Sequence, residues 1–220
     1  RFFLNVGLNC DQIDQTGQKT TANIGPYQQG EYLYRMGDPC KALYVVHAGS
    51  VKTEILTPDG DLHISGFYLT GELFGAEGIH QRRFGCDAIA LEKTWVCELT
   101  LENWGRLSET YPKLQRELAT ELSRIIAHKE YEALATHYHL LEQRLMSFLM
   151  DLRERVSERM GHPMNEIKLS MTKTDIARYL GATLESVSRT FSKLEKTGHL
   201  INEGRSIKIL KGLPHMDRAI

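Results

Sequence analysis

The spacing of glycine is the feature that most limits the folds open to this chain of 220 residues. Between residues 21 and 100, short runs of valine, isoleucine, leucine, tyrosine and phenylalanine alternate with glycine. Glycines at positions 30, 37, 49, 60, 66, 71, 75, 78 and 85, among others, punctuate this segment at short intervals. Such frequent turn residues interrupt long helices but leave room for short strands. We therefore predict an antiparallel β-roll, of the cupin-like jelly-roll type, for this part of the chain.

The sequence Pro58-Asp59-Gly60-Asp61 supports the β-roll, because it separates two strand-like runs, "VKTEIL" and "LHISGFY". Glycine at this position can adopt the positive φ that a tight hairpin turn requires. We expect a β-hairpin with its turn at these residues.

Beyond Leu99 glycine becomes rare, and leucine, glutamate, arginine and alanine predominate, which favours helices. Pro112 suits the first turn of a helix. Apolar residues then recur at three- and four-residue spacing, at Leu114, Leu118, Leu122, Ile125 and Ile126. This pattern predicts one helix over residues 112–136 and a second over 139–160, which ends at Gly161-His162-Pro163.

A helix as long as 112–136 needs a partner for its apolar stripe. A second copy of the chain can provide that partner through a coiled-coil seam, so we expect a homodimer. The alternative is that the helix packs only on its own β-roll.

Charge is distributed unevenly along the chain, although its formal net charge is only -1. Residues 162–220 contain ten lysines and arginines against six aspartates and glutamates, a net charge of +4, which leaves -5 for residues 1–161. A basic C-terminal part favours binding to nucleic acid. No apolar run approaches the roughly 18 residues of a membrane span, so we expect no membrane association.

The four cysteines, Cys10, Cys40, Cys86 and Cys97, include no CxxC pair, and no secretory leader precedes them. This usage favours a reducing compartment and a cytoplasmic location. Because the sequence begins with Arg1 rather than Met, we expect it to be a fragment of a longer chain. Residues 1–20 have weak periodicity and are expected to form a short helix or a packed lead-in.

The segment "LSMTKTDIARYLGATLESVSRTFSKLEKTGHLI" predicts two helices joined by a tight glycine turn. Thr172 and Asp175 have the spacing of a capping box at the start of the first helix, which Gly181 ends. Thr183 can cap the second helix, whose apolar side consists of Val187, Phe191 and Leu194.

Glu185, Ser188 and Arg189 fall together on the other side of the second helix, in its first turns. Arginine can pair with guanine, glutamate can accept a hydrogen bond from cytosine or adenine amino groups, and serine can serve in either role. A helix-turn-helix presents the start of its second helix to DNA in this way. The alternative is that Glu185 and Arg189 form an ordinary surface ion pair.

Further candidate DNA contacts lie at the two helix starts, where Thr172, Lys173 and Thr183 are placed for backbone phosphates. The closing segment "HLINEGRSIKIL", with a turn at Asn202-Glu203-Gly204, predicts two strands. Together these features indicate a winged helix-turn-helix.

The order of β-roll, long helix and winged helix-turn-helix resembles the CRP/FNR superfamily of bacterial transcription regulators over essentially the whole chain. The segment "TLESVSRTFSKLEKTGHL" is similar to the FNR (fumarate and nitrate reduction regulator) branch, whose pattern Glu-x-x-Ser-Arg is carried here by Glu185, Ser188 and Arg189. The cyclic-AMP receptor branch has arginine and glycine where Leu184 and Ser188 stand.

This resemblance implies an α+β protein with a sensor β-roll at residues 1–110, a dimerisation helix at 111–137 and a DNA-binding domain at 138–220. It implies a palindromic target with TTGAT and ATCAA half-sites, read by a homodimer on double-stranded DNA. It also implies RNA polymerase as a partner, contacted by Asp59, Gly60 and Asp61 in the predicted hairpin turn. A plain solvent-exposed hairpin is the alternative for that turn.

The FNR branch senses oxygen through a 4Fe-4S cluster held by three N-terminal cysteines and one on the β-roll. The segment "DAIALEKTWVCEL" resembles the stretch with the β-roll ligand and assigns that role to Cys97. Cys10 falls where the family has no ligand, so three further ligands would precede Arg1. The alternative for Cys97, and our expectation for Cys10, Cys40 and Cys86, is a small buried apolar residue.

Two other site types are less well matched. The segment "GELFGAEGIHQRRFGCDA" resembles a cyclic-nucleotide phosphate cassette and keeps Gly71, Glu72 and Leu73, but Arg82-Arg83-Phe84 lacks the required hydroxyl, so we expect a charged surface turn. Haem or nitric oxide as the effector, or a regulator without any effector, also remain alternatives.

A cupin-type metalloenzyme would need an His-x-His pair and a glutamate on strands, whereas His47, His63 and His80 are isolated and His137 and His139 stand at a helix junction. We therefore expect no enzyme activity.

Overall fold

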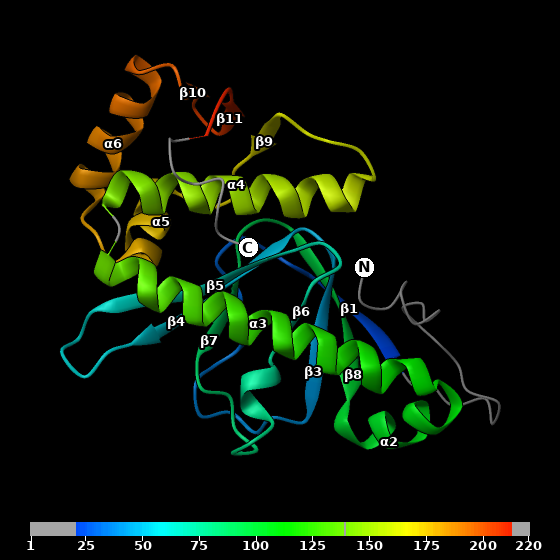
Figure 1. Cartoon of the computed structure of the whole chain (residues 1–220). Helices are drawn as coiled ribbons and strands as arrows, with labels where there is room; N and C mark the ends of the chain where they lie inside the picture. Colours follow the sequence, from blue (N-terminus) through cyan, green and yellow to red (C-terminus); the bar gives the residue numbers. More distant parts are fainter. Residues whose placement is uncertain (1–20, 139, 213–220) are drawn as a thin grey trace. The chain divides into compact units, whose positions relative to one another are not determined.

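The computed structural model describes residues 21–138 and 140–212 (Figure 1). The expectations for residues 1–20, including Cys10, and for His139 lie outside the described residues. By its internal contacts the chain divides into two compact units, of which one ends at His128 and the other begins at Lys129.

The first unit contains two antiparallel sheets of four strands each. One sheet has the order β1-β8-β3-β6 and the other β2-β7-β4-β5. The bounds are β1 (Thr21–Tyr27), β2 (Tyr32–Tyr34), β3 (Ala42–Ala48), β4 (Ser50–Leu56), β5 (Leu62–Leu69), β6 (Leu73–Phe74), β7 (Asp87–Ala90) and β8 (Thr94–Thr100), with a short 3-10 helix η1 (Ala76–Gly78) after β6. The predicted β-roll is confirmed.

The predicted hairpin turn joins β4 to β5. The Thr57 amide donates a hydrogen bond to the Asp61 carbonyl at 2.8 Å, and Gly60 has φ +87°. The pairing of Leu56 with Leu62 closes the hairpin. Asp59, Gly60 and Asp61 are exposed at its tip.

Aromatic side chains fill the interior between the two sheets. The rings of Tyr34 and Phe84 stack with their centroids 3.6 Å apart and an interplanar angle of 10°. Tyr44 and Phe74 stack beside them, with centroids 5.5 Å apart. Tyr34, Phe74 and Phe84 are buried, so the centre of the β-roll is a packed core.

Two helices follow β8, and the second continues past His128, where this unit ends. Helix α2 (Leu101–Thr110) begins after Thr100, whose hydroxyl accepts a hydrogen bond from the Asn103 amide at 3.2 Å. Helix α3 (Pro112–Tyr138) begins at Pro112, as predicted, and extends two residues beyond the predicted end. Figure 1 shows α3 as one uninterrupted helix.

The apolar stripe of α3 divides between two environments. Leu114 is fully buried and Leu118 packs on the same cluster, which contains Leu43 of β3 and Leu99 of β8. Farther along the helix, Ile126 and Leu134 are exposed in the single chain. The start of the stripe therefore packs on the β-roll, while its later part presents apolar surface to solvent.

The second unit contains α4 (Leu141–Met160), α5 (Lys173–Leu180), α6 (Leu184–Lys196) and a three-stranded sheet of order β10-β11-β9. The strands are β9 (Glu166–Lys168), β10 (Leu200–Glu203) and β11 (Ser206–Ile209). Gly161 ends α4 with φ +74°, as its sequence predicts. The predicted turn of the wing is shifted, because Asn202 and Glu203 still pair with β11. Strand β9 was not predicted from the sequence.

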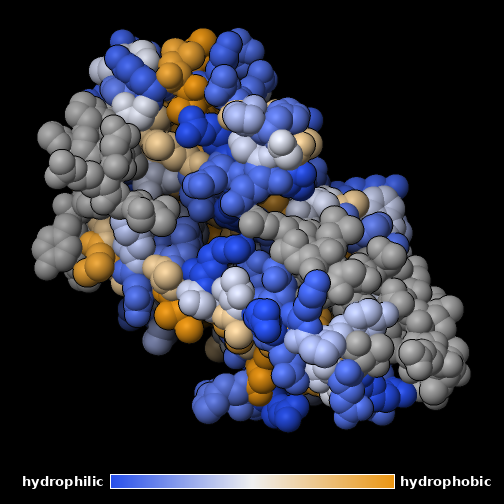
Figure 2. Space-filling model, turned by 45° about the vertical axis from the view of Figure 1, so that its right-hand side comes forward, coloured by the Kyte–Doolittle hydropathy of each residue, from blue (hydrophilic) through white to orange (hydrophobic). Residues whose placement is uncertain are grey.

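The face of the molecule seen in Figure 2 is mostly hydrophilic, with hydrophobic residues in small separate patches. Of the helices in the described ranges, none is long and apolar enough to cross a membrane.

Gly49, between β3 and β4, provides a test of the β-roll packing. Its φ is +92°, and a Cβ there would lie 2.5 Å from the Thr94 hydroxyl oxygen and 2.7 Å from the Lys93 carbonyl oxygen. We expect Gly49→Ala to lower the free energy of unfolding by about 2–4 kcal/mol, from the positive φ and the overlap together. Gly37 has φ +88° and no atom within 4 Å of such a Cβ, so Gly37→Ala should cost only about 1–2 kcal/mol. Equal losses in urea unfolding would contradict this interpretation.

Candidate nucleic-acid interface

Helices α5 and α6 form a helix-turn-helix with defined caps. The Thr172 hydroxyl accepts a hydrogen bond from the Asp175 amide at 3.1 Å, and the Asp175 carboxylate accepts one from the Thr172 amide at 2.9 Å. The predicted capping box is therefore present. Gly181 ends α5 with φ +61°, and the Thr183 hydroxyl accepts from the Ser186 amide at 3.2 Å to cap α6.

The apolar side of α6 is completely buried. Val187, Phe191 and Leu194 have no measurable exposure, and α6 contacts α4, α5 and β10. Since neighbouring helix residues point about 100° apart, this burial directs the opposite side of α6 to solvent.

Glu185 and Arg189 stand on that exposed side. Their side chains are 72% and 79% exposed, and Arg189 Nη2 lies 2.6 Å from Glu185 Oε1. Without DNA the two residues thus form the surface ion pair that was the alternative interpretation of the sequence. Such an exposed pair stabilises a helix by only about 0.3–0.5 kcal/mol, so both groups remain available to base edges at little cost.

An open depression runs along α6 from Ser188 and Arg189 to its C-terminal end. Its lining residues are Ser188, Arg189, Ser192, Lys193, Lys196 and Thr197. Ser188 is half-buried beside Arg189. The structure therefore places Glu185, Ser188 and Arg189 close together, with one carboxylate, one hydroxyl and one guanidinium for hydrogen bonds with bases.

Thr172 and Lys173 both have local structural contacts. The Thr172 hydroxyl also donates to the Asp175 carboxylate at 2.6 Å, so it belongs to the cap. The Lys173 ammonium lies 5.2 Å from the centroid of the Phe191 ring, which links the start of α5 to α6. The phosphate contacts of Thr172, Lys173 and Thr183 remain predictions.

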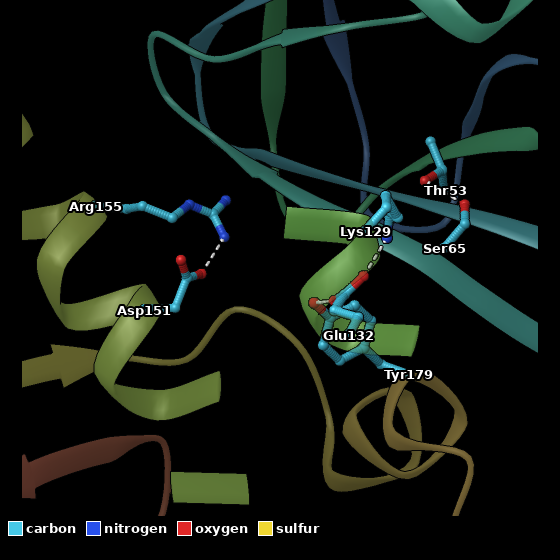
Figure 3. A network of polar contacts seen from close by, with 7 residues as sticks. All are labelled: Thr53, Ser65, Lys129, Glu132, Asp151, Arg155 and Tyr179. Atoms are coloured by element: carbon cyan, nitrogen blue, oxygen red, sulfur yellow. Dashed lines mark hydrogen bonds and ion pairs between the residues drawn. The ribbon is translucent and has the colours of Figure 1, made fainter. Parts of the chain in front are cut away.

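A polar network holds α5 against the last turns of α3 (Figure 3). The Tyr179 hydroxyl donates a hydrogen bond to Glu132, and Lys129 Nζ lies 2.6 Å from the same carboxylate. The Phe148 ring of α4 packs against Tyr179 with centroids 5.1 Å apart. The role of Tyr179 was not predicted from the sequence, because one tyrosine on a short amphipathic helix carries no signal of a distant partner.

Helix α5 is also attached at its C-terminal end. Arg144 Nη1, on α4, donates a hydrogen bond to the Leu180 carbonyl at 2.6 Å. A guanidinium at this position is favourable, because the carbonyls of a final helical turn lack partners within the helix.

The segment that resembles a nucleotide cassette is occupied by internal contacts. The Glu72 carboxylate accepts a hydrogen bond from the Leu69 amide at 2.9 Å. Arg82 has a left-handed backbone with φ +56°, and Arg83 Nη1 donates to the Gly37 carbonyl at 2.6 Å. Phe84, which follows the two arginines, stacks on Tyr34 inside the roll. These contacts favour the charged surface turn that the sequence predicts.

The buried thiols of the β-roll are not reactive thiolates. Burial, with the Glu77 carboxylate nearby as a second cause, raises the pKa of Cys86 above its usual range. Its sulfur donates to Glu77 Oε1 at 3.3 Å. Burial also raises the pKa of Cys40, so the structure places both cysteines as protonated, buried side chains.

Cys97 lies on β8 between Asn23 of β1 and Val45 of β3, and it is 1% exposed. Within the described ranges, no group of three or more histidine, cysteine, aspartate or glutamate residues could hold a metal ion. The ligand role of Cys97 remains a prediction.

Comparisons with known proteins agree with this architecture. Residues 143–212 match the family model of the Crp-like helix-turn-helix domain, and residues 25–111 match that of the cyclic nucleotide-binding domain. The electron transport regulator A of Shewanella oneidensis is 34% identical over 92% of this chain and 80% of its own length. The fumarate and nitrate reduction regulatory protein of Escherichia coli is 34% identical over the same shares. The structure of FixK2 from Bradyrhizobium japonicum matches with a TM-score of 0.75 and 26% identity, over 87% of this chain and 92% of that one.

The capping box of α5 can be tested apart from DNA binding. We expect Thr172→Ala to lower the free energy of unfolding by about 1 kcal/mol, because the Asp175 amide loses its acceptor. Thr172→Ser keeps the hydroxyl and should unfold close to the wild type in urea. If alanine and serine behaved alike, the hydroxyl would not be the stabilising group.

Proposed function

This chain belongs to the CRP/FNR family of DNA-binding transcription regulators, and on that premise we propose that it reads a TTGAT/ATCAA-like palindrome as a homodimer. The family consists of transcription regulators, not of enzymes, which agrees with the expectation from the sequence. The observation that carries the proposal is the group of Glu185, Ser188 and Arg189 on α6, in which the glutamate and the arginine are exposed and the serine is half-buried. In this proposal Arg189 pairs with guanine and Glu185 accepts from a base amino group.

The palindrome follows from the proposed dimer, because a two-fold protein presents two equivalent recognition helices to successive major grooves. The exposed Ile126 and Leu134 of α3 support a seam between two copies of this helix. We propose residues 111–137 as the dimerisation element, 1–110 as the sensor domain and 138–220 as the DNA-binding domain. Because the DNA target lies there, a cytoplasmic location belongs to the proposal.

RNA polymerase is the second proposed partner. The tip of the β4–β5 hairpin supports this role, since Asp59, Gly60 and Asp61 are exposed and two of them are acidic. An exposed, charged loop on a rigid hairpin is well suited to a transient protein contact.

Oxygen or redox sensing through a 4Fe-4S cluster is the proposed signal. It rests on the FNR-like reading residues and on the segment around Cys97. The cluster would require Cys97 as a thiolate and three further thiolates from a segment before Arg1. When bound, such a cluster would supply redox chemistry at the β-roll.

Arg189→Ala tests the base-reading proposal. We expect the free energy of binding to the specific duplex to weaken by about 1–3 kcal/mol, while binding to a random duplex changes less. Arg106→Ala, on α2 of the other unit, serves as a matched control. An equal loss on both duplexes in equilibrium titrations would mean that Arg189 contacts phosphate and that the reading assignment is wrong.

The sensing proposal is tested with the protein extended to its initiating Met and purified without oxygen. We expect binding to a labelled TTGAT/ATCAA duplex to fall on exposure to air, together with release of iron and sulfide. Cys97→Ser should remove both the cluster absorbance and the response. Tight binding that is indifferent to air would keep the DNA-binding proposal and overturn the cluster.

A further inference from the structure

The C-terminal half of α6 carries cationic groups that base reading does not use. Lys193 and Lys196 stand in its last turn and line the same open depression as Arg189 and Ser192. Arg189, Ser192 and Lys196 follow at three- and four-residue spacing, so they share one side of the helix. With a rise of about 1.5 Å per residue, Lys196 lies roughly 10 Å along the axis from Arg189.

The two lysines differ in their contacts. Lys193 forms an ion pair with Glu142, in the first turn of α4, although its own side chain is 64% exposed. Within the described part of the chain, Lys196 has no carboxylate at ion-pair distance and is exposed. Lysines in a final helical turn also interact favourably with the helix dipole, which is the purely structural account of both residues.

A duplex would meet this surface beyond the bases. When the start of a recognition helix enters the major groove, its later turns come near the sugar-phosphate backbone, as the C-terminal end of a homeodomain recognition helix does. The depression offers ammonium groups and a serine hydroxyl, which are common phosphate partners. The neighbouring Glu142 carboxylate has the opposite effect, since it neutralises Lys193 and repels a phosphate.

We propose that Lys193 and Lys196 bind phosphates of the DNA backbone next to the bases read by α6, and that Glu142 weakens this binding by competing for Lys193. The inference rests on the proposed placement of α6 in the major groove. The pair of Glu142 and Lys193 then lowers affinity for all sequences, while the choice of sequence remains with Glu185, Ser188 and Arg189.

The test measures the salt dependence of binding by the full chain to a labelled specific duplex and a labelled random duplex. We expect Lys196→Gln and Lys193→Gln each to weaken binding to both duplexes by the same factor. Each should also reduce the slope of log K against log salt concentration by about 0.9, the value for one lost phosphate contact. Lys113→Gln, which removes the same charge in the first turn of α3, should leave the slope unchanged.

Glu142→Gln distinguishes competition from a structural ion pair. It keeps the side-chain shape and frees Lys193, so we expect several-fold tighter binding to both duplexes. Weaker binding, as in Lys193→Gln, would show that the pair only positions α6, and would overturn the competition. Urea unfolding of each variant separates these effects from loss of folding.

Unchanged slopes for both lysine variants would overturn the phosphate site. If the slopes changed as expected but the wild type bound both duplexes equally, the base-reading proposal would fail and the phosphate site would stand. Wild-type protein that bound neither duplex would overturn both.

Discussion

The burial of one side of α6 is the interaction on which the DNA-binding surface depends. Val187, Phe191 and Leu194 are enclosed by α4, α5 and β10, and each such side chain contributes about 1.5–3 kcal/mol when fully buried. Because helix geometry fixes the angle between residues, this packing also fixes where Glu185 and Arg189 point. The exposed ion pair between those two is too weak to orient the helix by itself. Apolar contacts therefore position the polar groups.

Much of this arrangement follows from local sequence signals. Glycine spacing predicts the β-roll, and Thr172, Asp175, Gly181 and Thr183 set the limits of α5 and α6, because caps and left-handed turns depend on residues a few positions apart. Contacts between distant segments have no such local signal. Strand β9, with only three residues, is defined by its pairing with β11, and Tyr179 is defined by Glu132, 47 residues earlier.

The β-roll shows that a shared fold does not require a shared ligand. Residues 25–111 match the cyclic nucleotide-binding domain, yet Tyr34, Phe74 and Phe84 occupy the interior and Arg83 is bound to the Gly37 carbonyl. An antiparallel roll is held by its strand pairing, so its centre can be filled by aromatic side chains without loss of the sheets. The residues of this interior, and not the fold, therefore determine which effector the β-roll can bind.

The network around Tyr179 also bears on how freely such regulators can be recombined. Lys129 and Glu132 belong to the last turns of α3, but their partner is on α5. A DNA-binding segment grafted into a chimera from the start of α4 would leave Tyr179 without the Glu132 acceptor, and a part-buried hydroxyl that loses its partner costs about 1–3 kcal/mol. The exchangeable segment thus begins within α3, and a functional chimera would need to include the last turns of that helix.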